Sequence, residues 1–225
     1  MPQPRIELVC FDLGGVLVKI CDGWAEACAR AAVAAPAHIQ NQAVKRRMRQ
    51  ITNRYETGQI DNTTFDVQTS EITGLTPHQV QAACRASLKE PYPGIDALLD
   101  ALAPTGLRTA CLSNTNARHW SMMLGKQSSE SSLPLYRLTY RLASHLIGAA
   151  KPETMIFKHF EKVTGAAPET ILFFDDTKEN CLAARARGWS AQRIDPRGDT
   201  AHQMYDHLVG YQVLRPAPWS KTTLS

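Results

Sequence analysis

Short apolar segments that alternate with longer amphipathic stretches constrain the fold of this chain more than any other feature of its sequence. The apolar segments have the length and composition of buried strands, and the stretches between them have the apolar spacing of helices. We expect strands at 8–11, 109–112, 138–143, 171–174 and 190–194, and helices at 95–103, 154–163 and 179–187. Strands that alternate with helices form a parallel sheet covered by helices on both faces. The sequence therefore predicts an α/β fold.

The alternation of strand and helix stops between residues 21 and 89. This stretch contains helix-like periodicity and turn signals but no convincing strand. Strand-to-strand connections in an α/β sheet are normally much shorter than this. We therefore expect a small helical cap at 21–91, inserted after the first strand, and a core that is formed by 1–20 and 92–225.

Local signals mark some element ends and loops. Asn62 and Thr76 are typical helix N-caps, and Pro77 suits the first position of the helix that would follow Thr76. Two polar segments outside the cap lack any periodicity. We expect a surface loop at 126–132 and a loose tail at 215–225.

The composition is that of an ordinary folded protein. The 225 residues are 44% apolar and 20% charged, which allows one large domain or one domain with a second small unit. The formal charge of +4 is spread along the chain, whereas nucleic-acid-binding proteins cluster their basic residues. No apolar run approaches the roughly 18 residues of a membrane span. We therefore expect neither a nucleic acid nor a membrane as partner.

The cysteine pattern indicates a reducing compartment. The six cysteines form no C-x-x-C pair, and Cys10 and Cys111 fall inside predicted strands. Because no stretch resembles a signal peptide, we expect a cytoplasmic location. The seven histidines lack zinc-ligand spacing, and no glycine-rich nucleotide-binding motif is present. Both a monomer and a homodimer are compatible with the sequence.

Polar residues follow the predicted strands at the positions where ligands bind in parallel sheets. Asp12 follows the first strand, and Gly14 and Gly15 permit a tight excursion of the backbone after it. Ser113 and Asn114 end the second strand ahead of a helix, where a hydroxyl and backbone N–H groups can hold a phosphate oxygen. Each segment taken alone also fits an ordinary turn or helix cap.

A lysine and an acidic pair complete this set of polar residues. Lys151 begins the tripeptide Lys-Pro-Glu ahead of a predicted helix. Asp175 and Asp176 follow the strand at 171–174, and adjacent carboxylates repel each other unless a cation or hydrogen-bond donors compensate. Mg²⁺ suits such a pair because it prefers oxygen ligands. Since all the segments follow strands of one sheet, together they predict a single site.

In this order the four motifs resemble those of the haloacid dehalogenase-like (HAD) hydrolase superfamily. The strings FDLGGVL, LSNTN, KPE and FFDDTKEN are most similar to the subgroup that contains a bacterial α-glucose-1-phosphate phosphatase and the amino-terminal phosphatase domain of soluble epoxide hydrolases. The resemblance covers most of the chain, and some members carry a small helical cap where this chain has its insert. It implies a Rossmann-like parallel sheet and a Mg²⁺-dependent phosphatase that acts on a small phosphorylated metabolite, with a sugar phosphate as one candidate.

The resemblance also implies a catalytic role for several motif residues. Asp12 would attack phosphorus and form an aspartyl-phosphate, which needs no prior deprotonation at neutral pH. Lys151 would neutralise the charge that Asp12 and the phosphate share. Ser113 and the amide of Asn114 would hold a phosphoryl oxygen.

A metal site follows from the same resemblance. Mg²⁺ would be bound by Asp12, by the backbone carbonyl of Gly14 and by Asp176, while Asp175 would contact a metal-bound water. Asn180, four residues after Asp176, would share a helical face with it and support the site.

Gly14 departs from the pattern of most phosphatases in the superfamily. They carry a second Asp there, which protonates the leaving oxygen and later activates water, although the similar subgroup also has glycine. General acid–base catalysis contributes roughly 10²–10⁴-fold, so we expect a steep dependence on the leaving group unless another acid exists. His119 and Asp175 are the first candidates for such an acid. His119 also fits a substrate contact or an ordinary position on a helix surface.

Two other functions remain open from the sequence. A 2-haloacid dehalogenase uses the same nucleophile without metal and also lacks the second Asp. An Arg just after the nucleophile and aromatic walls would favour it, but no Arg lies between Asp12 and Trp24, and the acidic pair suits a metal. The second alternative is a catalytically weak binding protein with the same fold, against which the complete set of motif residues argues.

Overall fold

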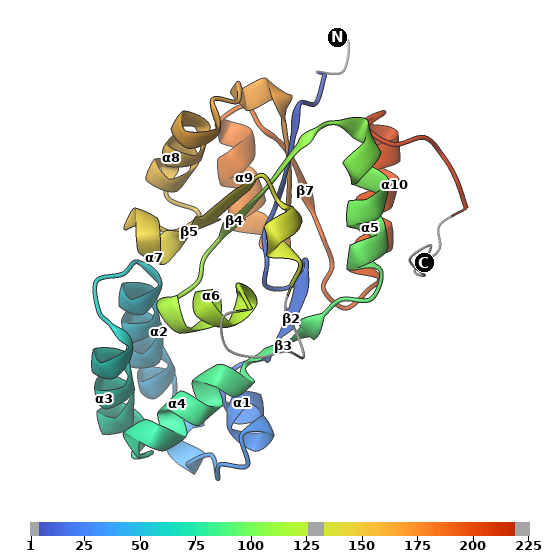
Figure 1. Ribbon diagram of the computed structural model, residues 1–225. Helices are drawn as coiled ribbons and strands as arrows, with labels where there is room; N and C mark the ends of the chain where they lie inside the picture. Colours follow the sequence, from blue (N-terminus) through green and yellow to red (C-terminus); the bar gives the residue numbers. More distant parts are fainter. Residues whose placement is uncertain (1–4, 126–132, 219–225) are drawn as a thin grey trace.

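Five parallel strands form the central sheet of the protein, which confirms the predicted α/β fold (Figure 1). The structure is a computed structural model that describes residues 5–125 and 133–218. The strands are β1 (Leu8–Phe11), β4 (Arg108–Ser113), β5 (Tyr140–Ala143), β6 (Ile171–Asp175) and β7 (Ser190–Arg193), in the spatial order β5-β4-β1-β6-β7. In the central strand, Cys10 lies between Ala110 of β4 and Phe173 of β6. The carboxyl ends of β1, β4 and β6 are therefore neighbours.

Helices cover both faces of this sheet because the β1 segment is apolar at every position. Val9 and Phe11 pack with one pair of helices, and Leu8 and Cys10 pack with the other pair on the opposite face. All four residues are 0% exposed, as expected for a strand that is buried on both sides. The first pair is α5 (Ile95–Leu102) and α10 (Thr200–Gly210), and the second pair is α8 (Thr154–Thr164) and α9 (Lys178–Ala186) (Figure 1).

Residues 21–91 contribute a helical layer that has its own apolar core (Figure 1). Its helices are α1 (Trp24–Arg30), α2 (Gln42–Glu56), α3 (Asn62–Thr73) and α4 (Pro77–Ala86), with a short 3-10 helix η1 (Ala37–Gln40). The rings of Tyr55 and Phe65 stack in this core with their centroids 4.2 Å apart. Val80 packs in the same core and is fully buried. This helical layer is the part of the chain that we interpret as the cap.

The starts of two cap helices test the predicted N-caps. Thr76 caps α4 as predicted, because its hydroxyl accepts a hydrogen bond from Gln79 N while the Gln79 side chain accepts one from Thr76 N. The prediction for Asn62 is wrong. Asp61 caps α3 by accepting a hydrogen bond from Thr64 N at 2.8 Å, and Asn62 is the first helical residue. Asp and Asn cap helices about equally well, so adjacent positions of these types cannot be ranked from sequence.

A two-stranded antiparallel sheet connects the cap to the core. It consists of β2 (Val18–Ile20) and β3 (Leu88–Pro91). The expectation of no strand between residues 21 and 89 is therefore wrong at the end of that stretch. Both strands are short and only partly buried, and β3 holds two charged residues and a proline, so neither strand forms an apolar run.

Several short elements complete the core: α6 (Ala117–Met123), α7 (Ser144–Ile147), η2 (Ala103–Thr105), η3 (Leu135–Arg137) and η4 (Pro168–Thr170). The loop expected at 126–132 lies outside the described residues, as does 219–225 of the expected tail. The described part of the tail is tied to α10, because the Tyr205 hydroxyl accepts a hydrogen bond from Ala217 N at 2.7 Å.

Within the described ranges, no helix combines the length and apolar character that crossing a membrane requires.

A buried ion pair joins the cap to the core. Arg118 of α6 donates two hydrogen bonds to the carboxylate of Asp66 in α3, with N···O distances of 3.0 and 2.7 Å. The two side chains are only 4% and 13% exposed. A pair removed from water in this way stabilises the fold only while both partners are present, because either one alone is a buried, uncompensated charge.

We expect Asp66→Ala to lower the free energy of unfolding by about 3–5 kcal/mol, because it leaves the Arg118 guanidinium buried without its counterion. Asp100→Ala is the matched control, since Asp100 pairs with Arg137 at an exposed position and its loss should cost less than about 1 kcal/mol. Urea unfolding followed by circular dichroism measures both values. Equal losses in the two variants would contradict the importance of the buried pair.

Candidate active site

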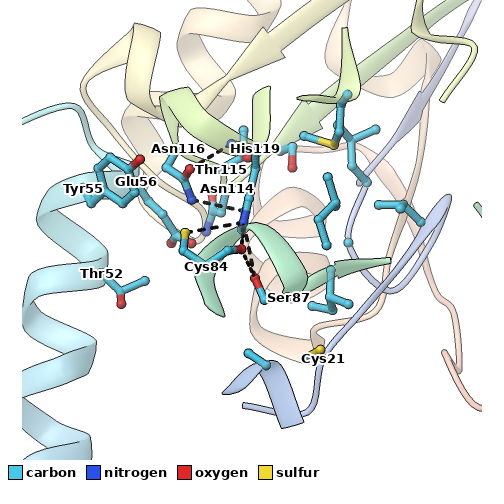
Figure 2. A pocket seen from close by; sticks show the side chains of 18 of the residues that line it. Cys21, Thr52, Tyr55, Glu56, Cys84, Ser87, Asn114, Thr115, Asn116 and His119 are labelled. Carbon is cyan, nitrogen blue, oxygen red and sulfur yellow. Dashed lines mark hydrogen bonds between the residues drawn. The ribbon is translucent and has the colours of Figure 1, made fainter. Parts of the chain in front are cut away.

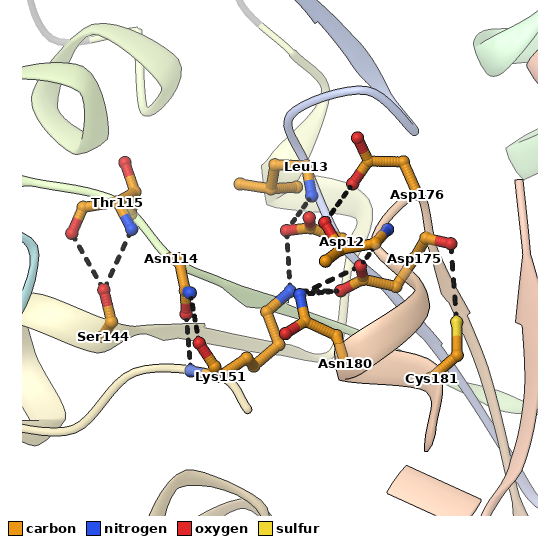
Figure 3. Close-up of polar contacts among 11 residues, drawn as sticks. Asp12, Leu13, Asn114, Thr115, Ser144, Lys151, Asp175, Asp176, Asn180 and Cys181 are labelled. Atoms are coloured by element: carbon orange, nitrogen blue, oxygen red, sulfur yellow. Dashed lines mark hydrogen bonds and ion pairs between the residues drawn. The ribbon is translucent and has the colours of Figure 1, made fainter. Parts of the chain in front are cut away.

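Asp12 and Lys151 form the centre of a polar cluster at the carboxyl end of β1 (Figure 3). Asp12 directly follows the strand, and its Oδ1 accepts a hydrogen bond from Leu13 N at 2.7 Å. The Lys151 ammonium lies 3.0 Å from the same oxygen, and the lysine side chain is 0% exposed. The carboxylate of Asp12 is thus held by a backbone amide and a buried positive charge.

Asn114 positions the backbone of Lys151. Its Nδ2 donates to the Lys151 carbonyl oxygen at 2.8 Å, and the Lys151 amide donates to Asn114 Oδ1, also at 2.8 Å. This reciprocal pair ties the end of β4 to the segment that precedes α8. Because the side-chain amide is engaged in both directions, the backbone N–H is the group of Asn114 that is left to fill the predicted role toward phosphate.

Asp175 is the second anchor of the lysine. Its Oδ2 accepts a hydrogen bond from Lys151 Nζ at 2.7 Å, and its Oδ1 accepts one from Thr177 N at 2.8 Å. Asn180 Nδ2 lies 3.0 and 3.1 Å from the two carboxylate oxygens. Asp175 is 0% exposed, so donors of the protein itself satisfy its charge.

Asp176 has far fewer partners than Asp175. It is half-buried, and the Thr177 hydroxyl is the donor to its carboxylate, at 3.2 Å. Asn180 supports the site through Asp175, and the expectation that it shares a helical face with Asp176 is wrong. The i, i+4 relation does not hold because α9 begins only at Lys178, so Asp176 lies outside the helix.

The three carboxylates of Asp12, Asp175 and Asp176 leave the cluster with excess negative charge. Each offers an oxygen within 4.8 Å of the others, and one lysine opposes them. Burial raises the pKa of Asp12 to about 7, although Lys151 acts in the opposite direction. Burial and the neighbouring Asp175 raise the pKa of Asp176. A hard divalent cation would relieve this repulsion, so the donor set fits a Mg²⁺ site.

Gly15 allows the backbone after β1 to approach these carboxylates closely. Its φ is +76°, a conformation that residues with a Cβ rarely adopt, and a Cβ built there would lie 2.6 Å from Asp176 Oδ2. Asp176 therefore fills the space that a side chain at position 15 would take. Both observations explain the second glycine of the first motif.

A cavity of about 220 Å³ lies between the core and the cap (Figure 2). Gly14, Ser113 and Asn114 line it from the core, and Trp24, Tyr55 and other residues line it from the cap. Ser113 is 2% exposed and follows the buried residues of β4, so its position is set by the sheet. Ser113 and Asn114 of the predicted phosphate-binding residues thus line one cavity, whereas Lys151 lies outside its lining.

His119 lines the same cavity, so the alternative that placed it on a helix surface is wrong (Figure 2). Asn116 Oδ1 accepts a hydrogen bond from His119 N at the start of α6, and this orients Asn116 Nδ2 toward the ring nitrogen Nδ1, 3.2 Å away. In the neutral ring, Nδ1 is therefore the acceptor. Nε2 donates to the carbonyl oxygen of Cys84 at 2.7 Å. Both ring nitrogens are thus engaged, and the contact of Nε2 joins α6 to the cap helix α4.

Sequence reasoning missed the cap side of the cavity. The lining residues from the cap include Trp24, Thr52, Tyr55, Glu56, Phe65, Cys84 and Ser87. They lie far along the chain from the motifs, and their local sequence does not distinguish them from ordinary residues of a helical core. The helical spacing of Thr52 and Glu56 places these two on one face of α2, but it does not say what that face contacts.

The chain belongs to the haloacid dehalogenase-like hydrolase family, whose model matches residues 6–188. It is therefore a hydrolase. This agrees with the parallel sheet and with the four motifs that meet at its carboxyl edge.

Known proteins that resemble the chain include both bacterial structures and a curated relative. The HAD family enzyme BT-2542 from Bacteroides thetaiotaomicron, in complex with magnesium and inorganic phosphate, is 26% identical with a TM-score of 0.72, and the match covers 88% of this chain and 98% of that one. "Phosphatase MT3486" of Mycobacterium tuberculosis is 29% identical over 110 residues, which is 48% of this chain and 48% of that protein. The match thus spans about half of the curated relative.

A dehalogenase shares the same fold. The L-2-haloacid dehalogenase from Xanthobacter autotrophicus superimposes with a TM-score of 0.61 over 97% of this chain and 92% of its own. At 18% identity, this similarity is informative about the fold alone.

We expect Asp12→Asn to stabilise the metal-free protein, and the gain should grow with pH. Because the pKa of Asp12 is about 7 in the folded protein and lower in the unfolded chain, ionisation of Asp12 opposes folding increasingly as the pH rises from about 4 to 7. In EDTA, the difference in unfolding free energy between variant and wild type should increase by about 2 kcal/mol between about pH 5 and pH 8. Urea titrations at the two pH values measure it, and a difference that does not change with pH would contradict the raised pKa.

Proposed function

We propose that the protein is a Mg²⁺-dependent phosphatase that hydrolyses a small phosphate monoester through an aspartyl-phosphate. The observation that carries the proposal is the clustering of Asp12, Lys151 and Asp176 at the carboxyl edge of the sheet, next to Gly14, which lines the cavity together with Ser113. The complex of the similar enzyme BT-2542 with magnesium and inorganic phosphate supports it, and so does the name of the curated relative.

Mg²⁺ would be held by Asp12, Asp176 and the backbone carbonyl of Gly14. Asp176 has oxygen capacity to spare, whereas the oxygens of Asp175 already accept hydrogen bonds from Lys151, Thr177 and Asn180. We therefore propose that Asp175 anchors Lys151 and contacts the metal only through a metal-bound water. When bound, the ion supplies positive charge that neutralises the phosphoryl group and favours the ionised form of Asp12.

The residues of the chain divide the chemical work as follows. Asp12 attacks phosphorus. Leu13 N and Lys151 Nζ both contact its Oδ1 and so orient the carboxylate for attack. Lys151 is held in turn by Asp175 and by the clamp from Asn114. The Ser113 hydroxyl and the backbone N–H of Asn114 donate to phosphoryl oxygens as negative charge builds on them.

The cavity indicates the size of the substrate. About 220 Å³ between the cap and the core is a volume that suits a small metabolite. Its floor is polar, and its cap side carries aromatic side chains such as Trp24 and Tyr55. Aromatic surfaces pack well against the apolar face of a sugar ring, which keeps sugar phosphates among the candidates.

The aromatic walls favour one second candidate, a 2-haloacid dehalogenase. Trp24, Tyr55 and Phe65 line the cavity, and a dehalogenase would use such walls around its carbon–halogen bond. The acidic pair and the absence of an Arg between Asp12 and Trp24 favour the phosphatase. Chloride release from 2-chloropropionate that continues in EDTA would support this second candidate.

We expect hydrolysis of p-nitrophenyl phosphate in the presence of Mg²⁺, its loss in EDTA, and its return when Mg²⁺ is restored. Asp12→Asn should abolish turnover because an amide is a poor nucleophile, while Asp100→Asn on the exposed surface should have no effect. Release of p-nitrophenol measures both. Turnover by Asp12→Asn at the wild-type rate would contradict the mechanism, and no turnover by any form would favour a binding protein.

We expect Gly15→Ala to raise the Mg²⁺ concentration for half-maximal activity by at least about tenfold, because the new Cβ would displace Asp176. Gly106→Ala is the control: Gly106 has a similar φ of +69°, but a Cβ there meets no atom within 4 Å. Both variants carry the backbone strain, but Gly15→Ala alone should change the metal titration. Identical titration curves would show that Asp176 does not hold the ion.

A further inference from the structure

The proposed phosphatase needs a group that protonates the leaving oxygen, and Gly14 supplies none. We propose that Glu56, the last residue of the cap helix α2, is this general acid and later the base that activates water. The inference rests on the proposed function. It places one catalytic residue on the cap, so the site would be complete only when the cap is docked on the core.

Glu56 lines the cavity that Gly14 and Ser113 also line (Figure 2). Its side chain extends from α2 into that cavity. Within the described part of the chain, no hydrogen bond or ion pair engages its carboxyl group. Among the described residues, its carboxyl group therefore has no contact that it would have to break in order to donate a proton to a substrate.

The backbone at Glu56 is fixed against the core. The Ser144 hydroxyl of α7 donates a hydrogen bond to the Glu56 carbonyl oxygen, and the same hydroxyl accepts one from Thr115 N at 2.9 Å. Two residues after Glu56, the chain passes so close to the core that a Cβ at Gly58 would lie 2.3 Å from the carbonyl oxygen of His145. The end of α2 is thus anchored to the loop that follows Ser113 and to α7, which fixes the backbone from which the Glu56 side chain extends.

The charges around Glu56 suit an acid that donates a proton near neutral pH. Burial raises its pKa, and His119 and Lys151 act in the opposite direction. Lys151, which contacts the nucleophile Asp12, is thus one of the charges that act on Glu56. A carboxyl group with a raised pKa retains its proton more readily than a surface glutamate does, and can regain it after each cycle.

The two acids considered from the sequence are already engaged. Both nitrogens of His119 form hydrogen bonds, to Cys84 O and with Asn116. Both oxygens of Asp175 accept hydrogen bonds from buried donors, including Lys151. Neither can serve the leaving group without breaking a contact that holds the site together, whereas Glu56 can.

The chemistry balances over two steps. First, Asp12 forms a bond to phosphorus while the bond from phosphorus to the leaving oxygen breaks, and that oxygen takes the proton of Glu56. Glu56 is now a carboxylate. It then removes a proton from water, whose oxygen bonds to phosphorus as the phosphorus–Asp12 bond breaks. Inorganic phosphate, the alcohol, ionised Asp12 and protonated Glu56 result.

Glu56→Gln tests the proposal, because glutamine keeps the shape of the side chain but cannot transfer the proton. For a simple alkyl phosphate, kcat/KM should fall by roughly 10²–10⁴-fold. For p-nitrophenyl phosphate, whose leaving group departs without a proton, kcat/KM should be unchanged. Its kcat should fall and a burst of p-nitrophenol should precede the steady state, because hydrolysis of the aspartyl-phosphate would lack its base.

Glu71→Gln is the control, because it makes the same chemical change at an exposed position on α3. It should leave kcat and kcat/KM unchanged for both substrates. If Glu56→Gln does not fold by circular dichroism, Glu56→Asp provides the same comparison with a retracted carboxyl. An equal loss on both substrates, or no loss on either, would overturn the role of Glu56. Absence of hydrolysis by the wild type would instead contradict the proposed function, and this inference with it.

Discussion

The buried ammonium of Lys151 is the interaction on which the rest of the site depends. It lies 3.0 Å from Asp12 and 2.7 Å from Asp175, and thus ties together the ends of two neighbouring strands, β1 and β6. A third strand takes part through Asn114, which clamps the lysine backbone at the end of β4. A buried lysine needs counterions, and carboxylates packed together need a cation, so each group makes the burial of the others possible. The arrangement still leaves excess negative charge, and this charge is the physical reason why the site fits a divalent cation.

The cap adds a second constraint, because the cavity exists only between the two units. The pair Arg118–Asp66 and the contacts of Glu56 and Gly58 with α7 hold the cap on the core. His119 contributes a further link to α4. These contacts place aromatic and acidic side chains along the cavity that Gly14 and Ser113 also line. Selection of the substrate and supply of a proton would then depend on the same docking that stabilises the fold.

The sequence predicted the sheet well because fully apolar strands leave few alternatives. A run such as Leu8–Phe11 has to be buried on both faces, and the polar residues that follow such runs then meet at one edge of the sheet. The motif residues of the core could be found for this reason. Local choices between equivalent groups could not be predicted, as with Asp61 instead of Asn62 at the start of α3. The partner of Asn180 depended on where α9 begins, and the cap side of the cavity depended on tertiary packing, which periodicity does not report.

The central claim is that phosphate passes through a covalent bond to Asp12. Mixing the enzyme with excess p-nitrophenyl phosphate and Mg²⁺, stopping the reaction with acid during the steady state, and sequencing the peptides by mass spectrometry would test it directly. The account predicts one phosphoryl group on the peptide that contains Asp12, at Asp12 itself, and none in a sample without Mg²⁺. A phosphoryl group on another residue, or steady phosphate release with no modified peptide under conditions that preserve acyl phosphates, would contradict it.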